Sequence, residues 1–134
     1  MKVTLNYAGV PWLSYVAVHY WFVVDVDGAE ERWEVWRKQN SGGICRGYLH
    51  RNLKNPSENL GGSQTQTAQV WTGNEAKEIA AALERSWEDY PYLDIYHYVP
   101  GPNSNTYVAW VLKQAKVSFS IRWRGVGSGY TYRR

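Results

Sequence analysis

Residues 17–24 read Ala-Val-His-Tyr-Trp-Phe-Val-Val and decide the fold class, because β-branched and aromatic side chains dominate the run. We extend this strand over Leu13 to Val26 and expect it at the centre of a sheet. Asp27-Gly28 is a tight-turn dipeptide, so Arg32 to Trp36 is predicted to return as the second strand of a hairpin. Alternating apolar and polar residues in Val3 to Tyr7 predict another, half-buried strand.

The stretch from about residue 38 to 70 carries five glycines among Asn, Ser and Gln and shows little periodicity. A connection of this length is typical of a lid or a binding loop. The same composition also suits a surface excursion that contains short strands, and the sequence leaves both interpretations open. No linker divides the chain, so residues 1–134 are expected to form one domain.

A helix is predicted to begin after Thr72, where Thr72 and Glu75 form a capping-box pattern. Apolar residues then recur at helical spacing, and Pro91 ends the helix near Asp89 because it disfavours helical geometry at the residue before it. With the strands above, this helix indicates an α+β fold in which an antiparallel sheet is packed by two main helices.

The second helix is predicted over Thr106 to Ala115, after a rigid Pro100-Gly101-Pro102 turn. Strands are expected on either side of it, over Tyr92 to Val99 and over Val117 to Trp123.

Composition excludes several classes of protein. The chain is 44% hydrophobic and 20% charged, which is a globular composition. Its single cysteine, Cys45, excludes an intramolecular disulfide framework. No apolar run of about 18 residues predicts a membrane helix, and the N-terminus lacks the pattern of a signal peptide, so a cytoplasmic location is expected. The net charge of +3 makes a nucleic-acid partner an unfavoured alternative.

Two segments can carry chemistry. Asn103 or Ser104 can cap the second helix, whose start presents free N–H groups and the positive end of the helix dipole. Such a helix start attracts an anion or stabilises the anionic form of a nucleophile. His19 lies within the apolar central strand and can serve as a base, an acid or a hydrogen-bond anchor. A plain capped helix and a structural histidine remain the simpler interpretations.

These segments also carry a resemblance. His19 to Val24, Tyr90 to Tyr92 and Gly101 to Trp110 resemble the motifs of an uncharacterised bacterial family, which itself implies no function.

The order of elements is similar, more distantly, to circularly permuted papain-like proteins, the relatives of NlpC/P60 peptidases and of the lecithin:retinol acyltransferase group. That resemblance implies a permuted papain-like fold, with His19 as the base and Ser104 in the position of the nucleophilic cysteine, between Asn103 and Tyr107. Serine is a far poorer acid than cysteine and requires an oriented base and an oxyanion hole. Glu34, on the neighbouring strand of the hairpin, is the candidate to orient His19.

These candidate residues suggest two alternative functions. The first is binding or sequestering of a small anionic, nucleotide-like ligand without turnover, in an aromatic and basic pocket at the helix start. The candidate ligand-binding residues are Asn103, Ser104, Asn105, Thr106, His19, Trp21, Arg46, Arg51, Arg122 and Arg124.

The alternative function is a hydrolase or acyltransferase of amide or ester bonds, with Ser104, His19 and Glu34 as its catalytic residues. Neither function requires a cofactor, and the three histidines show no metal-ligand spacing. The high aromatic content leaves a homodimer open.

Overall fold

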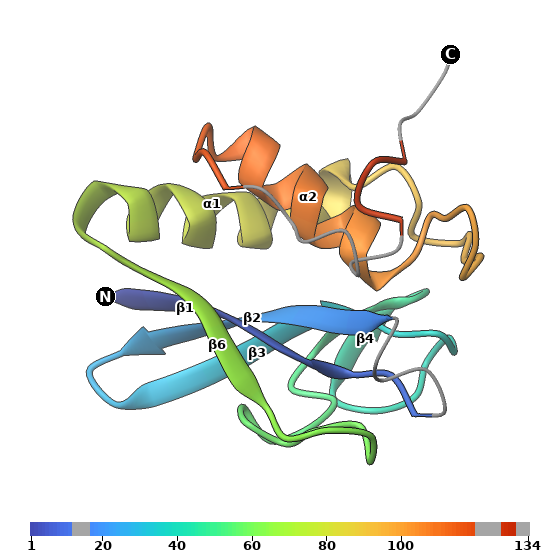
Figure 1. The fold of residues 1–134 in the computed structure, drawn as a ribbon. Helices are drawn as coiled ribbons and strands as arrows, with labels where there is room; N and C mark the ends of the chain where they lie inside the picture. Colours follow the sequence, from blue (N-terminus) through green and yellow to red (C-terminus); the bar gives the residue numbers. More distant parts are fainter. Residues whose placement is uncertain (12–16, 120–126, 131–134) are drawn as a thin grey trace.

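A six-stranded antiparallel sheet and two helices form the structure, a computed structural model that describes residues 1–11, 17–119 and 127–130. The strands are β1 (Lys2–Gly9), β2 (Val18–Val26), β3 (Ala29–Val35), β4 (Ile44–Arg46), β5 (Leu49–Arg51) and β6 (Gln66–Thr72), and the helices are α1 (Gly73–Asp89) and α2 (Ser104–Gln114). The strand order is β4-β5-β3-β2-β1-β6. Both helices cover one face of the sheet (Figure 1). The prediction of an α+β fold is confirmed.

The β2–β3 hairpin forms as predicted, since Val26 pairs with Ala29 across the turn. Asp27 and Gly28 both adopt positive φ angles, 53° and 88°, as a two-residue hairpin turn requires. β2 occupies the centre of the sheet and pairs with β1 on its other side. The predicted beginning of this strand, over residues 12–16, lies outside the described residues.

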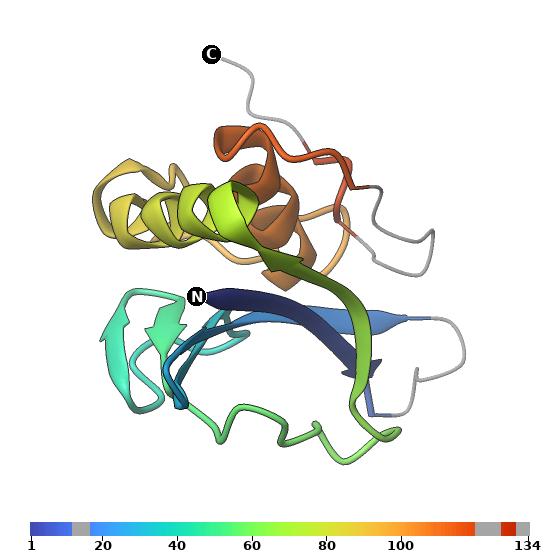
Figure 2. The same cartoon turned by 90° about the vertical axis from the view of Figure 1, so that its left-hand side faces the viewer.

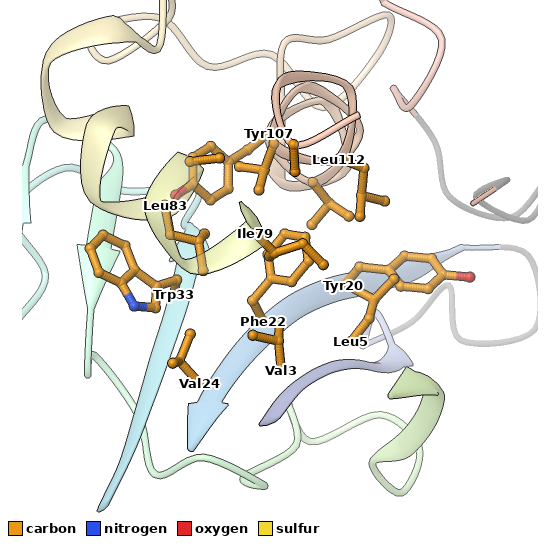
Figure 3. Packing of buried hydrophobic residues seen from close by; sticks show 14 of the residues in the cluster. Val3, Leu5, Tyr20, Phe22, Val24, Trp33, Ile79, Leu83, Tyr107 and Leu112 are labelled. Atoms are coloured by element: carbon orange, nitrogen blue, oxygen red, sulfur yellow. The ribbon is translucent and has the colours of Figure 1, made fainter. Parts of the chain in front are cut away.

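Alternate residues of the central strands point to opposite faces of the sheet. On the helix side, Val3, Leu5, Tyr20, Phe22, Val24 and Trp33 meet Ile79, Leu83, Tyr107 and Leu112 from the helices (Figure 3). This is the main hydrophobic core. On the opposite face, a smaller apolar cluster contains Ala8, Trp21 and Val23. The segment between β5 and β6 runs along this face (Figure 2).

The stretch from 38 to 70 contains regular structure, as the second interpretation of its sequence allowed. β4 and β5 form a short hairpin against β3, and β6 begins at Gln66 and pairs with β1 along the opposite edge. The expectation of a structureless lid is therefore wrong for these parts. The strands in this stretch are too short or too polar for their sequences to show an alternating pattern. They form because the chain pairs here with β3 and with β1.

Helix α1 ends at Asp89 as predicted, but its predicted capping box does not form. Thr72 is the N-cap residue and its side chain makes no capping hydrogen bond. Thr72 is also the last residue of β6, where it pairs with Lys2. Gly73, at a φ of 61°, then turns the chain directly from strand into helix.

The strand predicted over Tyr92 to Val99 is wrong, because this segment forms turns. Its backbone bonds are irregular: the Tyr48 N–H donates to Leu93 O (2.8 Å), and the His97 N–H donates to Pro102 O (2.8 Å). Residues 117–119 are not a strand either, and residues 120–123 of that prediction lie outside the described part of the chain.

Candidate functional site

Asn105 fastens the start of α2 to the beginning of β2. Its side-chain oxygen accepts a hydrogen bond from the Tyr20 N–H (3.1 Å), and its side-chain nitrogen donates to Val18 O (2.8 Å). Figure 1 shows this end of α2 beside the end of the sheet where β2 begins. A helix near the C-terminus thus reaches the strand that carries His19. This contact explains how residues about 85 positions apart come to share one site.

Asn103 is the N-cap of α2, which begins at Ser104, so of the two cap residues that the sequence left open the structure has the first. Its Oδ1 accepts from the N–H groups of Asn105 (2.9 Å) and Thr106 (3.3 Å), while Thr106 Oγ1 accepts from the Asn103 N–H (3.0 Å). This capping box satisfies donors that were expected to serve a ligand. Within the described chain, the Ser104 N–H and the Ser104 hydroxyl have no hydrogen-bond partner.

His19 lies on the face of the sheet opposite the helices and is bonded to Glu34. His19 Nε2 and Glu34 Oε2 are 2.6 Å apart, and both side chains are buried. Arg32 holds the same carboxylate from the other side, with Nε 2.7 Å from Oε1 and Nη2 3.0 Å from Oε2. The His19 ring stacks on Trp21 and meets the edge of Trp36. His19 therefore has a fixed position and a fixed orientation.

Glu34 is ionised in this setting. Burial alone raises the pKa of its carboxyl, but the hydrogen bond from His19 and the electrostatic attraction of His19, followed by the charge and hydrogen bonds of Arg32, together lower that pKa to about 2. A carboxylate only accepts hydrogen bonds, so His19 Nε2 carries the proton of the His19–Glu34 bond. In the neutral ring, His19 Nδ1 then holds the lone pair. Nδ1 has no hydrogen-bond partner in the described residues.

A pocket of about 220 Å³ opens at this end of the sheet. It is lined by Val10, Pro11, Val18, His19, Val35, Trp36, Arg37, Leu60, Tyr96, Tyr98, Asn103, Ser104 and Asn105. His19 and Ser104 thus border the same cavity, although no hydrogen bond joins them. Arg37 is the single arginine or lysine among these lining residues, and it makes no ion pair with the described part of the chain.

Tyr98 is among the residues that line the pocket. Its hydroxyl oxygen is buried and has no hydrogen-bond partner among the described residues. Asn103 Nδ2 donates to Tyr98 O (2.6 Å), so the residue before Ser104 also fixes the backbone of Tyr98. Burial raises the pKa of the Tyr98 phenol, which keeps it protonated and able to donate. Sequence reasoning placed Tyr98 on a strand and missed it.

Two of the proposed ligand-binding residues have other roles. Trp21 is fully buried and does not line the pocket; its ring stacks on His19, and its Nε1 donates to Pro56 O (2.8 Å). Thr106 faces away from the pocket, where Oγ1 donates to Gly127 O (2.6 Å). Both residues support the site through contacts outside the pocket.

The arginines expected to close over the pocket do not line it. Arg46 bonds Trp87 O (2.6 Å) and pairs with Glu88 (3.4 Å), whereas Arg51 lies 3.8 Å from Glu31 and 4.0 Å from Glu84. The β4–β5 hairpin turns both toward acidic side chains of other elements, so these two arginines do not make the pocket basic. Arg122 and Arg124 lie outside the described residues.

Sequence reasoning also missed Arg32, Trp36, Arg37 and Tyr96, which surround the site. One signal was available for Arg32: it precedes Glu34 by two positions on a strand, so both side chains point to the same face. No group of three metal-ligating side chains occurs in the part of the chain that the structure describes. In the same residues, no helix is long and apolar enough to cross a bilayer.

No curated protein and no solved structure matches the chain. A family model does match residues 1–130, which is nearly the whole length. The chain therefore belongs to the family described as a protein of unknown function, DUF3750.

Proposed function

We propose that this protein is a hydrolase or acyltransferase acting on an amide or ester bond, with Ser104 as nucleophile, His19 as general base and Glu34 as the group that orients His19. The observation that supports it most is the His19–Glu34 bond of 2.6 Å beside a pocket that His19 shares with Ser104. The order of parts, with the base on a strand and the nucleophile at a helix start, also favours a permuted papain-like arrangement.

The chemistry follows from the free atoms of these residues. His19 Nδ1 takes the proton from the Ser104 hydroxyl as Oγ attacks the substrate carbonyl, forming a tetrahedral intermediate. The C–N or C–O bond then breaks, and His19 returns the proton to the departing amine or alcohol, which leaves an acyl group on Ser104. A water molecule or a second alcohol or amine then takes up the acyl group by the same two steps.

The negative oxygen of the intermediate requires donors that are not otherwise occupied. The N–H groups of Asn105 and Thr106 already donate to Asn103 Oδ1, so the donor that remains at the helix start is the Ser104 N–H. The second donor that we assign is the Tyr98 hydroxyl, because Tyr98 lines the same pocket and this buried hydroxyl has no hydrogen-bond partner among the described residues. Together they form a two-donor oxyanion site.

Pocket size and polarity restrict the substrate. A volume of about 220 Å³ lies below the ~300 Å³ at which pockets begin to enclose drug-sized molecules. Val10, Val18, Val35 and Leu60 provide apolar walls, and Arg37 is the cation that can meet an anionic group. The pocket therefore suits one acyl group or one end of a longer substrate.

Binding of a small anionic ligand without turnover is the second candidate. It is favoured by Arg37, which has no ion pair within the described residues, and by the aromatic rings of Trp36, Tyr96 and Tyr98 around the pocket. The positions of Arg46 and Arg51 outside the pocket weaken this binding proposal, because a nucleotide-like ligand carries more than one negative charge. In this case the pocket holds the anionic group or the ring, not the whole molecule.

Covalent labelling separates the two candidates. A fluorophosphonate probe reacts with an activated serine, and the adduct is located by mass spectrometry of peptides. We expect an adduct on Ser104 in the wild type and in Ser57→Ala, an exposed-serine control, and none in Ser104→Ala. Absence of any adduct on wild-type Ser104 would contradict the enzyme proposal. Stabilisation by a nucleotide in a thermal-shift screen, equal in wild type and Ser104→Ala, would then support binding.

A further inference from the structure

Arg37 brings a positive charge to the rim of the pocket. It is exposed to solvent, and no aspartate or glutamate is among the described residues that line the pocket with it. Within the described part of the chain, no acidic side chain forms an ion pair with Arg37. The sequence has no aspartate or glutamate in residues 12–16, 120–126 and 131–134. The charge of Arg37 is therefore available to a bound molecule.

The backbone around Arg37 is fixed by hydrogen bonds on both sides. The Trp36 N–H donates to Tyr48 O (2.9 Å), and the Asn40 N–H donates to Gly47 O (3.2 Å). The guanidinium carbon of Arg37 lies 5.1 Å from the centroid of the Trp36 ring, which is within the range of a cation–π contact. Arg37 is therefore held at the pocket although its side chain is exposed.

Trp36 also connects Arg37 with the candidate catalytic groups. Its ring is nearly perpendicular to the His19 ring, and the two centroids are 5.7 Å apart. Burial raises the pKa of the Tyr96 phenol to about 12, and the positive charge of Arg37 opposes that rise, so the guanidinium also acts on a second pocket residue. Because Arg37 and His19 contact the same ring, a short molecule in the pocket can reach both.

The number of uncompensated charges indicates the kind of anion. A second cation, Lys54, lies 4.9 Å from the centroid of the Trp36 ring, but its Nζ is 3.7 Å from Glu58 Oε2. Among the described residues at the rim, Arg37 is thus the cation without an acidic partner. A carboxylate carries one negative charge, and its two oxygens match the fork of a guanidinium. A phosphate monoester carries nearly two charges and requires more cations.

We propose that Arg37 is a specificity-determining residue that binds a carboxylate of the substrate, so that the substrates are amides or esters in which a carboxylate lies a few bonds from the carbonyl that Ser104 attacks. The reaction in this inference rests on the proposed function, whereas the carboxylate site itself requires no turnover. The carboxylate belongs either to the acyl part or to the departing amine or alcohol, and the experiment distinguishes these two sources.

The test uses two matched pairs of small amides and NMR titration of the full chain. Glutaramate and neutral glutaramide differ by a carboxylate on the acyl part, and N-butanoylglycine and N-butanoylglycinamide differ by one on the departing amine. In the wild type we expect the anionic member of one pair to bind about tenfold more tightly than its neutral partner. This is the low end for hydrogen bonds to a charged group, because Arg37 is exposed. The pair that shows the preference identifies the source of the carboxylate.

Variants of two adjacent residues assign the preference to the pocket. Arg37→Met should reduce the ratio of affinities to about one, and Arg37→Glu should make the neutral member the better ligand. Lys38→Met is the matched control, since it removes an exposed charge next to Arg37 that does not line the pocket, and it should leave the preference unchanged. Because Arg37 is exposed, both of its variants are expected to fold, and circular dichroism verifies this.

Three results overturn the inference: neither anionic probe binds the wild type, neither pair shows a preference, or the preference persists in Arg37→Met. Fluorophosphonate labelling of Ser104 tests the proposed function separately. Labelling without a carboxylate preference keeps the hydrolase or acyltransferase and rejects the role of Arg37. A preference that depends on Arg37 without labelling keeps the carboxylate site and rejects the enzyme.

Discussion

The two faces of the central hairpin are made from alternate residues of the same two strands, yet one face is apolar and the other carries buried charges. Phe22 and Trp33 face the helices and are buried among apolar side chains. Arg32 and Glu34 face the other way and are equally buried, but they form a hydrogen-bonded ionic cluster with His19. The first face forms the main hydrophobic core, whereas the second holds buried charges beside the pocket.

Burial of a side chain therefore does not by itself show that the residue belongs to a hydrophobic core. Burying a charged pair costs desolvation energy that the pairing only partly returns, so such clusters are weak evidence for a stabilising role. A second face that is polar, fully paired and open to a pocket is better explained by chemistry. The following predictions are ordered by the size of the expected effect.

The sharpest contrast is between two residues of β2 that lie on opposite faces of the sheet. Phe22→Ala should lower the free energy of unfolding by about 3–5 kcal/mol, because it opens a cavity in the main core. His19→Gln keeps a donor for Glu34 and should cost about 1 kcal/mol, while it reduces the labelling of Ser104 by roughly a thousandfold or more. Urea unfolding and labelling rates measure the two effects. Equal loss of stability in both variants would remove the distinction between the faces.

Glu34 makes the polar face sensitive to acid. Its folded-state pKa is about 2, below its ordinary value of 4.5, so its contribution to stability is complete above pH 4.5 and is lost as the pH falls toward 2. The loss amounts to about 3 kcal/mol by the usual conversion. Urea unfolding at a series of pH values measures it. Glu34→Gln should lack this part of the acid loss, and Glu30→Gln controls for the removal of one carboxyl; identical curves for all three proteins would contradict the prediction.

Tyr98→Phe tests the free hydroxyl beside the helix start. Removing an oxyanion donor should slow the labelling of Ser104 about a hundredfold, whereas thermal stability should stay the same or rise, because an unsatisfied buried hydroxyl is lost. Tyr90→Phe is the matched control, since its buried hydroxyl also has no hydrogen-bond partner in the described residues and does not line the pocket. Equal labelling of both variants would exclude Tyr98 from the site.

Gly127→Ala should disturb the site from the C-terminal side. A Cβ on Gly127 would lie 2.3 Å from Asn103 Nδ2, and its φ of 92° disfavours any side chain. We expect a loss of about 1–2 kcal/mol, comparable to the loss of a helix cap, with slower labelling of Ser104. Gly129→Ala, where an added Cβ meets nothing within 4 Å, is the control. If Gly127→Ala matches that control in thermal denaturation, the packing against Asn103 does not support the cap.

Much of the fold could be predicted because its signals are local. The hairpin turn, the end of α1 before Pro91 and the Asn103 cap each depend on a few adjacent residues. The short strands β4 and β5 could not be predicted, since pairing with β3 creates them. The segment from 92 to 99 was wrongly predicted as a strand for the opposite reason: its aromatic residues are buried or half buried, as Tyr92 and Tyr96 are, without pairing to a neighbouring strand.

The candidate site likewise has parts that the sequence indicated and parts that it did not. From the sequence alone, His19 and Glu34 could be assigned to the two strands of one hairpin, and Asn103 or Ser104 to the cap of the following helix, because tight turns and helix caps are short-range signals. Only the tertiary structure decided that these two parts meet at one pocket, that Arg46 and Arg51 stay away from it, and that Arg32 and Tyr98 belong to it. Those facts depend on contacts between distant segments, such as Asn105 with β2, which no local pattern encodes.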